Sequence, residues 1–214
     1  VFLVLGIYLT SNAKDKVQDP KAINIDLSLF RTNNQFNIGA YGIIISISFT
    51  FVMIILGLTQ GMQPIIGYNY GAKLQYRVLS TLKKGMIAGF VITTIGFLVA
   101  ELCPRLIASA FTNDEEMINL SITGFRLFML AFPIVGMQIV ASNFFQAIGK
   151  AKIAIFLSLT RQLLFLIPAL YLIPLILELN GVWLSTAVAD FLSAFVSLWV
   201  LVVAIKKMKK EISL

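Results

Sequence analysis

Three ionisable side chains, Asp190, Arg126 and Arg161, lie inside long segments that otherwise consist mostly of apolar residues. A charge at the centre of a membrane costs roughly 2.5–3.5 kcal/mol on insertion scales, so each of the three needs a reason. One carboxylate and two guanidinium groups could form a static ion pair that holds helices together. They could also face a polar cleft and exchange partners during a conformational change. A lipid-facing arrangement is the third alternative.

The positions of these residues within their segments place all three at a similar depth. At about 1.5 Å per residue, Asp190 lies roughly 12 Å, Arg126 roughly 13 Å and Arg161 roughly 18 Å from the outer side. An arginine side chain can bridge such differences, so we expect the three groups to lie close together. Glu101 and Arg105 lie nearer the outer surface and are expected to anchor their helix there.

Uncharged amide side chains form a second set of candidates: Gln60, Gln63, Gln138, Asn143, Gln146 and Gln162. Gln60 and Gln63 are three positions apart and share a helix face, as do Asn143 and Gln146, whereas Gln138 precedes Asn143 by five positions. Amides inside a membrane either hydrogen-bond a neighbouring helix or line a polar cleft. Both interpretations remain open for this set.

The sequence lacks the residues that most enzyme and metal sites require. It contains no histidine and a single cysteine, Cys103, which excludes His-based metal sites, a Ser-His-Asp triad and a disulfide within the chain. A phosphate-binding loop needs adjacent Gly-Lys followed by Ser or Thr, but here Ala72 separates Gly71 from Lys73 and Leu74 follows. We therefore expect neither an enzyme nor a cofactor.

The composition is that of an integral membrane protein. Of the 214 residues, 58% are hydrophobic and 13% are charged, whereas soluble domains carry roughly 25% charged residues. The net charge of +7 could indicate nucleic-acid binding. The bases, however, lie in short segments between apolar runs, which is the pattern of membrane orientation. We expect the lipid bilayer as a partner and no nucleic acid.

Five apolar segments are long enough to cross a membrane as helices, the form in which one segment satisfies its own backbone hydrogen bonds. They are Ile38–Tyr68, Gly85–Ala110, Met117–Ile148, Ile153–Leu177 and Val182–Ile205. Residues 1–10, VFLVLGIYLT, cover only about 15 Å of helix. We interpret them as the end of a truncated sixth helix and the chain as a fragment. The expected fold class is an all-α membrane protein.

The glycines near the end of the first segment predict close helix packing. Gly57 and Gly61, and then Gly67 and Gly71, form two small-xxx-small pairs that permit close contact between helices. Gly71 is also expected to let the chain turn as it leaves the membrane.

The charges in the joints between the segments predict the orientation in the membrane. Basic residues occupy the first and third joints and the tail 206–214, namely Lys73, Arg77, Lys83, Lys84, Lys150, Lys152, Lys206, Lys207, Lys209 and Lys210. The alternate joints, TNDEE at 112–116 and ELNG at 178–181, are acidic and carry no base. Within TNDEE, Thr112 and Glu115 have the spacing of a helix-capping box. Because bases mark the cytoplasmic side, we expect the C-terminus in the cytoplasm.

The segment 11–37 breaks this alternation. It has the character of a cytoplasmic joint because it holds four bases, Lys14, Lys16, Lys21 and Arg31. The span that begins at Ile38 nevertheless has to start outside, and no stretch before it is apolar and long enough to cross. We therefore expect a basic linker from which a spanning helix is missing. An amphipathic segment at the membrane surface is the alternative.

Four stretches have a specific order and spacing: IGAYGI, GLTQGMQPIIGYNYGA, FRLFMLAFPIVGMQIVASNFFQAIGKAKIAIFLSLTRQ and GVWLSTAVADFLS. They resemble the C-terminal half of a multidrug and toxic compound extrusion (MATE) transporter of the multidrug-efflux branch, from about Ile38 to the end of the chain. The resemblance implies a twelve-helix, two-lobe transporter in which residues 38–205 form five helices of the C-terminal lobe. Residues 1–10 would end helix six, and the missing helix would be the seventh.

The resemblance also implies a function. Members of the family export drug-like, often cationic molecules in exchange for H+ or Na+, which implies a secondary antiporter of a bacterial inner membrane whose coupling ion is H+ or Na+. The missing N-terminal lobe would be its partner, and the fragment alone is not expected to transport. Asp190 falls in a recurring Ala-Asp segment of the family, but we expect the coupling carboxylate in the missing lobe. A lipid-linked saccharide flippase and a non-transporting remnant are the alternatives.

The alternation of basic and acidic joints gives a direct test of topology. A reporter fused after Leu214 should be found in the cytoplasm, and one inserted at Asp114 should be external. Paired alkaline phosphatase and green fluorescent protein fusions measure the two sides. An external C-terminus would contradict the assignment of the spans.

Overall fold

The structure of the chain is a computed structural model that describes the backbone of residues 27–212 and the side chains of 38–177 and 180–210. The predicted end of a helix at 1–10 lies outside these residues. The described part is helical, as predicted, and consists of α2 (Leu27–Gly71), α3 (Gln75–Leu102), α4 (Pro104–Ser109), α5 (Glu115–Phe128), η1 (Met129–Ala131), α6 (Phe132–Ala147), α7 (Ala151–Leu159), η2 (Thr160–Leu166), α8 (Ile167–Leu172) and α9 (Pro174–Ile212).

Five stretches of these helices are long and apolar enough to cross a membrane: Ile38–Gly71, Gln75–Leu102, Glu115–Ala147, Ala151–Leu177 and Asn180–Lys210. The five-span prediction is thereby confirmed by length and composition. Helix α2 begins at Leu27, so the second part of the segment 11–37 is helical and runs directly into the first span. The separate helix that the alternation of sides requires before Ile38 stays a prediction.

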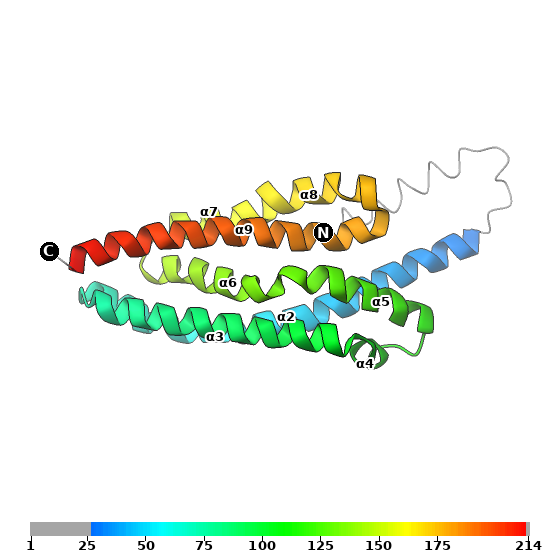
Figure 1. The fold of residues 1–214 in the computed structure, drawn as a ribbon, viewed down its shortest axis with the longest axis horizontal. Helices are drawn as coiled ribbons and strands as arrows, with labels where there is room; N and C mark the ends of the chain where they lie inside the picture. The colour runs from blue at the N-terminus through cyan, green and yellow to red at the C-terminus, as the bar shows by residue number, and fades with distance from the viewer. Residues whose placement is uncertain (1–26, 213–214) are drawn as a thin grey trace.

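The helices form an elongated bundle whose two ends differ in charge. The α2–α3 joint, the α6–α7 joint and the last turns of α9 lie at one end, whereas α4, the start of α5 and the α8–α9 joint lie at the other (Figure 1). The first end carries the ten bases of the joints and the tail, and we name it the basic end. The second carries Glu101 and the acidic run 114–116, and we name it the acidic end.

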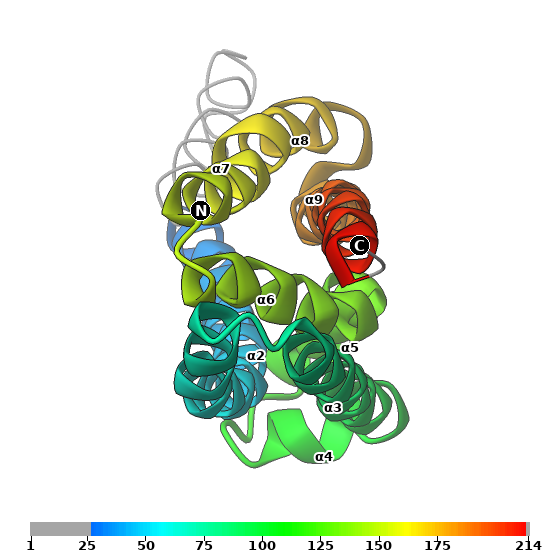
Figure 2. The ribbon, with the colours of Figure 1, turned by 90° about the vertical axis from the view of Figure 1, so that its left-hand side faces the viewer.

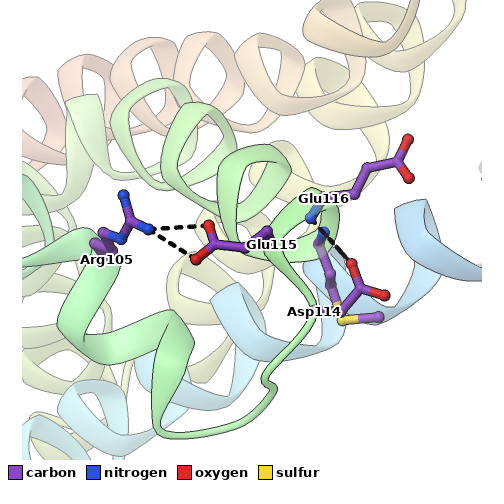
Figure 3. A network of polar contacts seen from close by, with 5 residues as sticks. Arg105, Asp114, Glu115 and Glu116 are labelled. Atoms are coloured by element: carbon purple, nitrogen blue, oxygen red, sulfur yellow. Dashed lines mark hydrogen bonds and ion pairs between the residues drawn. The ribbon is translucent and has the colours of Figure 1, made fainter.

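The joint before α5 is held by a helix cap that differs from the predicted one. Asp114, not Thr112, is the capping residue: its Oδ1 accepts hydrogen bonds from the backbone N–H groups of Glu116 at 2.9 Å and Met117 at 3.3 Å (Figure 3). Thr112 instead accepts from the backbone N–H of Asp114. Arg105 donates to both carboxylate oxygens of Glu115, an exposed pair that adds little stability.

The turn after α2 uses a lysine where a glycine is common. Gly71 closes the helix, and Lys73 adopts a left-handed conformation with φ of 58°. The backbone N–H of Lys73 donates to the carbonyl three residues earlier, and the next N–H donates to the carbonyl five residues before it. The same two hydrogen bonds recur at the α6–α7 joint, where Gly149 takes the left-handed position with φ of 75°. The prediction that Gly71 provides the turn is therefore wrong.

The reversal between α8 and α9 depends on Gly181. A Cβ atom on this residue would lie 2.7 Å from the carbonyl oxygen of Ile173 and 2.7 Å from Cα of Pro174. In a straight helix, residues eight positions apart are separated by about 12 Å. The chain therefore doubles back within the first turns of α9, and the last span runs antiparallel to α7 and α8 (Figure 1).

Helices α3 and α6 lie next to each other (Figure 2) and cross at two glycines that were not among those predicted to pack closely. A Cβ on Gly89 would lie 3.0 Å from the carbonyl oxygen of Gly136, and a Cβ on Gly136 would lie 2.7 Å from the carbonyl carbon of Gly89. Thr93 strengthens the crossing because its hydroxyl donates to the carbonyl of Pro133 at 2.9 Å. At Gly57 and Gly61, in contrast, an added Cβ would meet no atom within 4 Å, so close packing there is not found.

The buried apolar side chains form two clusters along the bundle. The acidic-end cluster includes Tyr41, Phe125, Phe132 and Trp183, and the basic-end cluster includes Ile66, Val78, Leu82, Phe144 and Met208. On α6 the last buried residue of the acidic-end cluster is Val135, and the first of the basic-end cluster is Val140. On α9 the last of the acidic-end cluster is Ala189, and the first of the basic-end cluster is Leu201. Between the clusters lies a layer that contains polar side chains, and this layer holds the candidate site.

The α3–α6 crossing predicts a position-specific effect of alanine. Gly136→Ala places a methyl group against the backbone of α3, and overpacking of this kind costs typically 1–3 kcal/mol. We expect a clear fall in the melting temperature of the purified chain in detergent. Gly61→Ala is the matched control, and it should leave the melting temperature unchanged or raise it, since alanine favours a helix. Equal effects of the two substitutions would contradict the crossing.

Candidate functional site

The centre of the polar layer is an ion pair between η2 and α9. Nε of Arg161 lies 2.6 Å from Oδ1 of Asp190, to which it donates a hydrogen bond. The aspartate side chain is 8% exposed and the arginine side chain 35% exposed. A carboxylate so deeply buried requires a partner, because an isolated buried charge is very costly. An ion pair that involves Asp190 was one of the alternatives that the sequence left open, and Arg161 is its partner in the structure.

Arg126 is not part of this pair, so the expectation of a three-residue charge group is wrong. Its side chain is 60% exposed and its Nε lies 3.7 Å from Oε1 of Glu101, near the acidic end. The prediction placed Arg126 beside Asp190 because the two residues lie at a similar depth in the membrane. Depth does not determine on which face of its helix a side chain lies. On α5 the neighbouring Gly124 and Phe125 are buried, and Arg126 points the other way. Glu101 is thus the partner of an exposed arginine.

Arg161 lies in an unusually wide stretch of helix. Residues Thr160–Leu166 form the π-helix η2 between α7 and α8. Pro168 follows closely; a proline has no N–H to donate and its ring crowds the carbonyl four positions earlier, which disturbs a regular α-helix. Single-turn π segments occur frequently at functional sites because they displace side chains from α-helical register. Here the displaced residues are Arg161 and Gln162.

Two cavities adjoin the ion pair, and both include Arg161 and Gln162 in their walls. The first, of about 250 Å³, we name the aromatic cavity; its described lining is Tyr41, Ile45, Ser48, Phe49, Val52, Phe128, Phe132, Val135, Arg161, Gln162, Leu166, Thr186 and Asp190. The second, of about 230 Å³, we name the amide cavity; its described lining is Leu56, Gln138, Ile139, Ser142, Asn143, Ser158, Arg161 and Gln162. Arg161 and Gln162 therefore border both an aromatic cavity and one with hydrogen-bonding walls.

Buried polar atoms without a partner lie at both cavities. Oγ1 of Thr186, in the wall of the aromatic cavity, is buried and has no hydrogen-bond partner among the described residues. The same holds for Oε1 of Gln138 at the amide cavity. The amide nitrogen of Gln138 donates to Ser193 at 2.9 Å, and Ser193 in turn donates to the backbone carbonyl of Asp190. Buried polar atoms normally have a partner, so these two oxygens are available to a water molecule or a ligand in the cavities.

The remaining amides have separate roles. Nε2 of Gln63 donates to Oδ1 of Asn143 at 3.2 Å and lies 3.5 Å from Oε1 of Gln146, so the predicted shared face of Asn143 and Gln146 faces α2. These three form a hydrogen-bonded seam between helices rather than an open polar wall, although Asn143 also borders the amide cavity. Gln60 is exposed.

Several residues of the site were not predicted from the sequence. Thr186 lies four positions before Asp190 and Ser193 three positions after it, so all three share a helix face, and this spacing was a usable signal. Ser142 and Ser158 could not be selected, since serine is common inside membrane helices and their approach to Arg161 depends on the packing of α6 against α7. Tyr41 is 1% exposed and also gave no local signal.

A larger hollow, of about 900 Å³, opens at the α2–α3 joint and is lined by Tyr70, Gly71, Lys73, Leu74, Gln75, Tyr76 and Arg77. None of the candidate residues borders it. Within the part of the chain that the structure describes, no three His, Cys, Asp or Glu side chains gather as metal ligands would. The chemistry available at the ion pair is thus charge recognition and hydrogen bonding.

Comparison with known proteins assigns this arrangement to a family. A family model described as MatE matches residues 25–172, well over half of the chain. The chain belongs to the MATE family of transporters. The resemblance inferred from the sequence is thereby confirmed, and the family consists of transporters rather than enzymes.

Individual relatives agree with the assignment. The chain is 25% identical over 173 residues to the multidrug export protein MepA of Staphylococcus haemolyticus (strain JCSC1435), covering 79% of this chain and 37% of the relative. The MATE multidrug transporter DinF-BH, solved in complex with R6G, is 33% identical with a TM-score of 0.72, covering 92% of this chain and 44% of that one. ClbM, a MATE transporter solved with Rb+, is 19% identical with a TM-score of 0.72, covering 98% and 46%.

The MATE chain therefore spans less than half the length of the relatives that it matches. Its helices correspond in arrangement to one part of these transporters. The fold class inferred from the sequence is therefore confirmed: an all-α membrane protein whose helices match part of a MATE transporter.

The unequal burial of the ion pair predicts unequal effects of substitution. Arg161→Gln leaves a deeply buried carboxylate without its partner, which costs on the order of 3–5 kcal/mol. Asp190→Asn should cost less, because Arg161 already has partial access to solvent. The double substitution should recover much of the loss that Arg161→Gln causes. Melting temperatures of the four proteins in detergent measure this cycle, and additive effects would show that the pair does not stabilise the fold.

Proposed function

We propose that this MATE chain forms the C-terminal lobe of a secondary multidrug exporter that exchanges drug-like molecules for H+ or Na+. The observation that carries the proposal is the family match together with the named export function of the MepA relatives. In this assignment the chain lies in a bacterial plasma membrane with its basic end and C-terminus in the cytoplasm. The bilayer and a second, N-terminal lobe are its structural partners.

The features of the site are consistent with this role. A ligand pocket is mostly apolar with a few placed polar groups, and the aromatic cavity has this composition around Arg161 and Thr186. The π-helix η2 borders it through Arg161, Gln162 and Leu166, and irregular backbone inside a membrane is tolerated where it lies against protein or a cavity. Relatives of similar fold were solved with R6G and with Rb+, which are a drug-like molecule and a cation.

The alternative of a lipid-linked saccharide flippase receives less support. A cavity that handles a pyrophosphate-linked lipid should present several bases. Among the described residues, Arg161 is the single base in the walls of the aromatic and amide cavities, and its Nε already donates to Asp190, so the cavities lack the several free bases that a pyrophosphate needs. Arg126, the other arginine considered for this role, lies outside both cavities.

Whether this chain can export drugs by itself can be tested in bacteria that lack their own drug pumps. Expressed alone, the 214-residue chain should give no efflux of ethidium, because alternating access requires two repeats that move about one site. Joined to a first lobe and a helix before Ile38, it should give efflux that a proton or sodium ionophore abolishes. Gradient-dependent efflux by the chain alone would refute the proposal that it works as one lobe.

A further inference from the structure

We propose that Arg161 binds the carboxylate group of an amphipathic cargo whose aromatic part occupies the aromatic cavity. That the ligand is a transported cargo rests on the proposed function. The ligand's chemical class and its binding position rest on the geometry around Arg161. It specifies the ligand class of the site: a molecule with one acidic group attached to a flat aromatic ring system.

The guanidinium group of Arg161 retains donors that Asp190 does not use. An arginine carries five N–H donors, and Asp190 accepts from Nε. Among the described residues no side chain or backbone carbonyl accepts from the two terminal nitrogens. The side chain is 35% exposed and forms part of the wall of both cavities, so these donors can reach a ligand. Two terminal N–H groups match the two oxygens of a carboxylate in a bidentate pair.

The amide cavity surrounds this position with further donors. The hydroxyl groups of Ser142 and Ser158 and the amide of Gln162 lie in its wall, and none of the three has a hydrogen-bond partner among the described residues. No acidic side chain belongs to the described lining of the cavity. On this side of Arg161 the wall thus presents unused guanidinium donors and several neutral polar groups, an arrangement that suits a carboxylate, while Asp190 holds Nε on the other cavity's wall.

The aromatic cavity provides the complementary apolar part. Phe49, Phe128 and Phe132 lie in its wall beside Tyr41, and flat rings pack favourably against such faces and edges. Arg161 and Gln162 border both spaces, so an acidic group at one side of Arg161 is directly adjacent to the aromatic space at the other. The two volumes, about 250 and 230 Å³, suit a small bicyclic acid.

The inference is tested by binding rather than by transport. The 214-residue chain, purified in zwitterionic lipid nanodiscs, is titrated at pH 7.5 with naphthalene-2-carboxylate and with the matched amide, naphthalene-2-carboxamide, by isothermal titration calorimetry. The two probes share one ring system and differ in charge. Because a charge-assisted hydrogen bond is stronger than a neutral one, we expect the acid to bind at least about ten times more tightly than the amide. Partition into the lipid would favour the neutral amide and cannot produce this preference.

Variants identify the residue responsible. Arg161→Gln should abolish the preference for the acid, whereas Arg126→Gln, which removes an arginine outside both cavities, should leave it unchanged. Arg161→Lys keeps the charge but lacks the planar fork, so it should reduce the preference several-fold. Ser142→Ala combined with Ser158→Ala should reduce it without loss of folding, and this variant decides the question if Arg161→Gln does not fold.

Equal affinity of the unsubstituted chain for the two probes would overturn the inference. So would a preference that persists in Arg161→Gln, or one that is unaffected by both Arg161→Lys and the double serine variant. These results leave the proposed function intact, because an exporter without an acid-binding site is still an exporter. Conversely, a failure of efflux in the joined two-lobe protein refutes the proposed function and leaves the binding preference as it is measured.

Discussion

A carboxylate and a guanidinium group at membrane depth have to find partners within the protein, and the contact between Arg161 and Asp190 meets this requirement. It holds η2 against α9 at the level where the acidic-end cluster gives way to the basic-end cluster. The π-helix before Pro168 brings the arginine into the cavity walls, and the remaining volume lies on both sides of it. The arrangement of the site thus follows from one ion pair and one irregular turn.

Helix α6 connects this pair with the rest of the lobe. Gly136 faces α3, where it packs against the backbone of Gly89, and Gln138 faces α9, where it donates to Ser193. Two positions along a helix correspond to a rotation of about 200°, so these contacts lie on opposite sides of α6. A change in the tilt of α6 would therefore alter the crossing with α3 and the support of Asp190 together.

Features that depend on composition or on one local pattern were predictable, and features that depend on helix rotation were not. The five spans and the difference in charge between the two ends follow from hydropathy and from the charges of the joints. The cost of a buried charge predicts an arginine partner for Asp190, but it does not decide between Arg126 and Arg161. The expected place of Arg126 failed because depth does not define a helix face. The small-xxx-small spacing of Gly57 and Gly61 did not indicate contact, since the close approach occurs at Gly89 and Gly136, which lie far apart in the sequence. The helix cap is Asp114 and not Thr112. Both residue types are favoured as caps, so the sequence alone does not show at which of the two the helix begins.

The single carboxylate in the described walls of the two cavities is already bound, and this constrains how charged ligands can use the site. A cation that approaches Asp190 has to compete with the guanidinium group of Arg161, which already donates to its Oδ1. An acidic group, in contrast, can use the terminal nitrogens of Arg161 while this hydrogen bond stays in place. Because the pair obstructs a cation and leaves donors open, the geometry of this site favours a ligand with an acidic group.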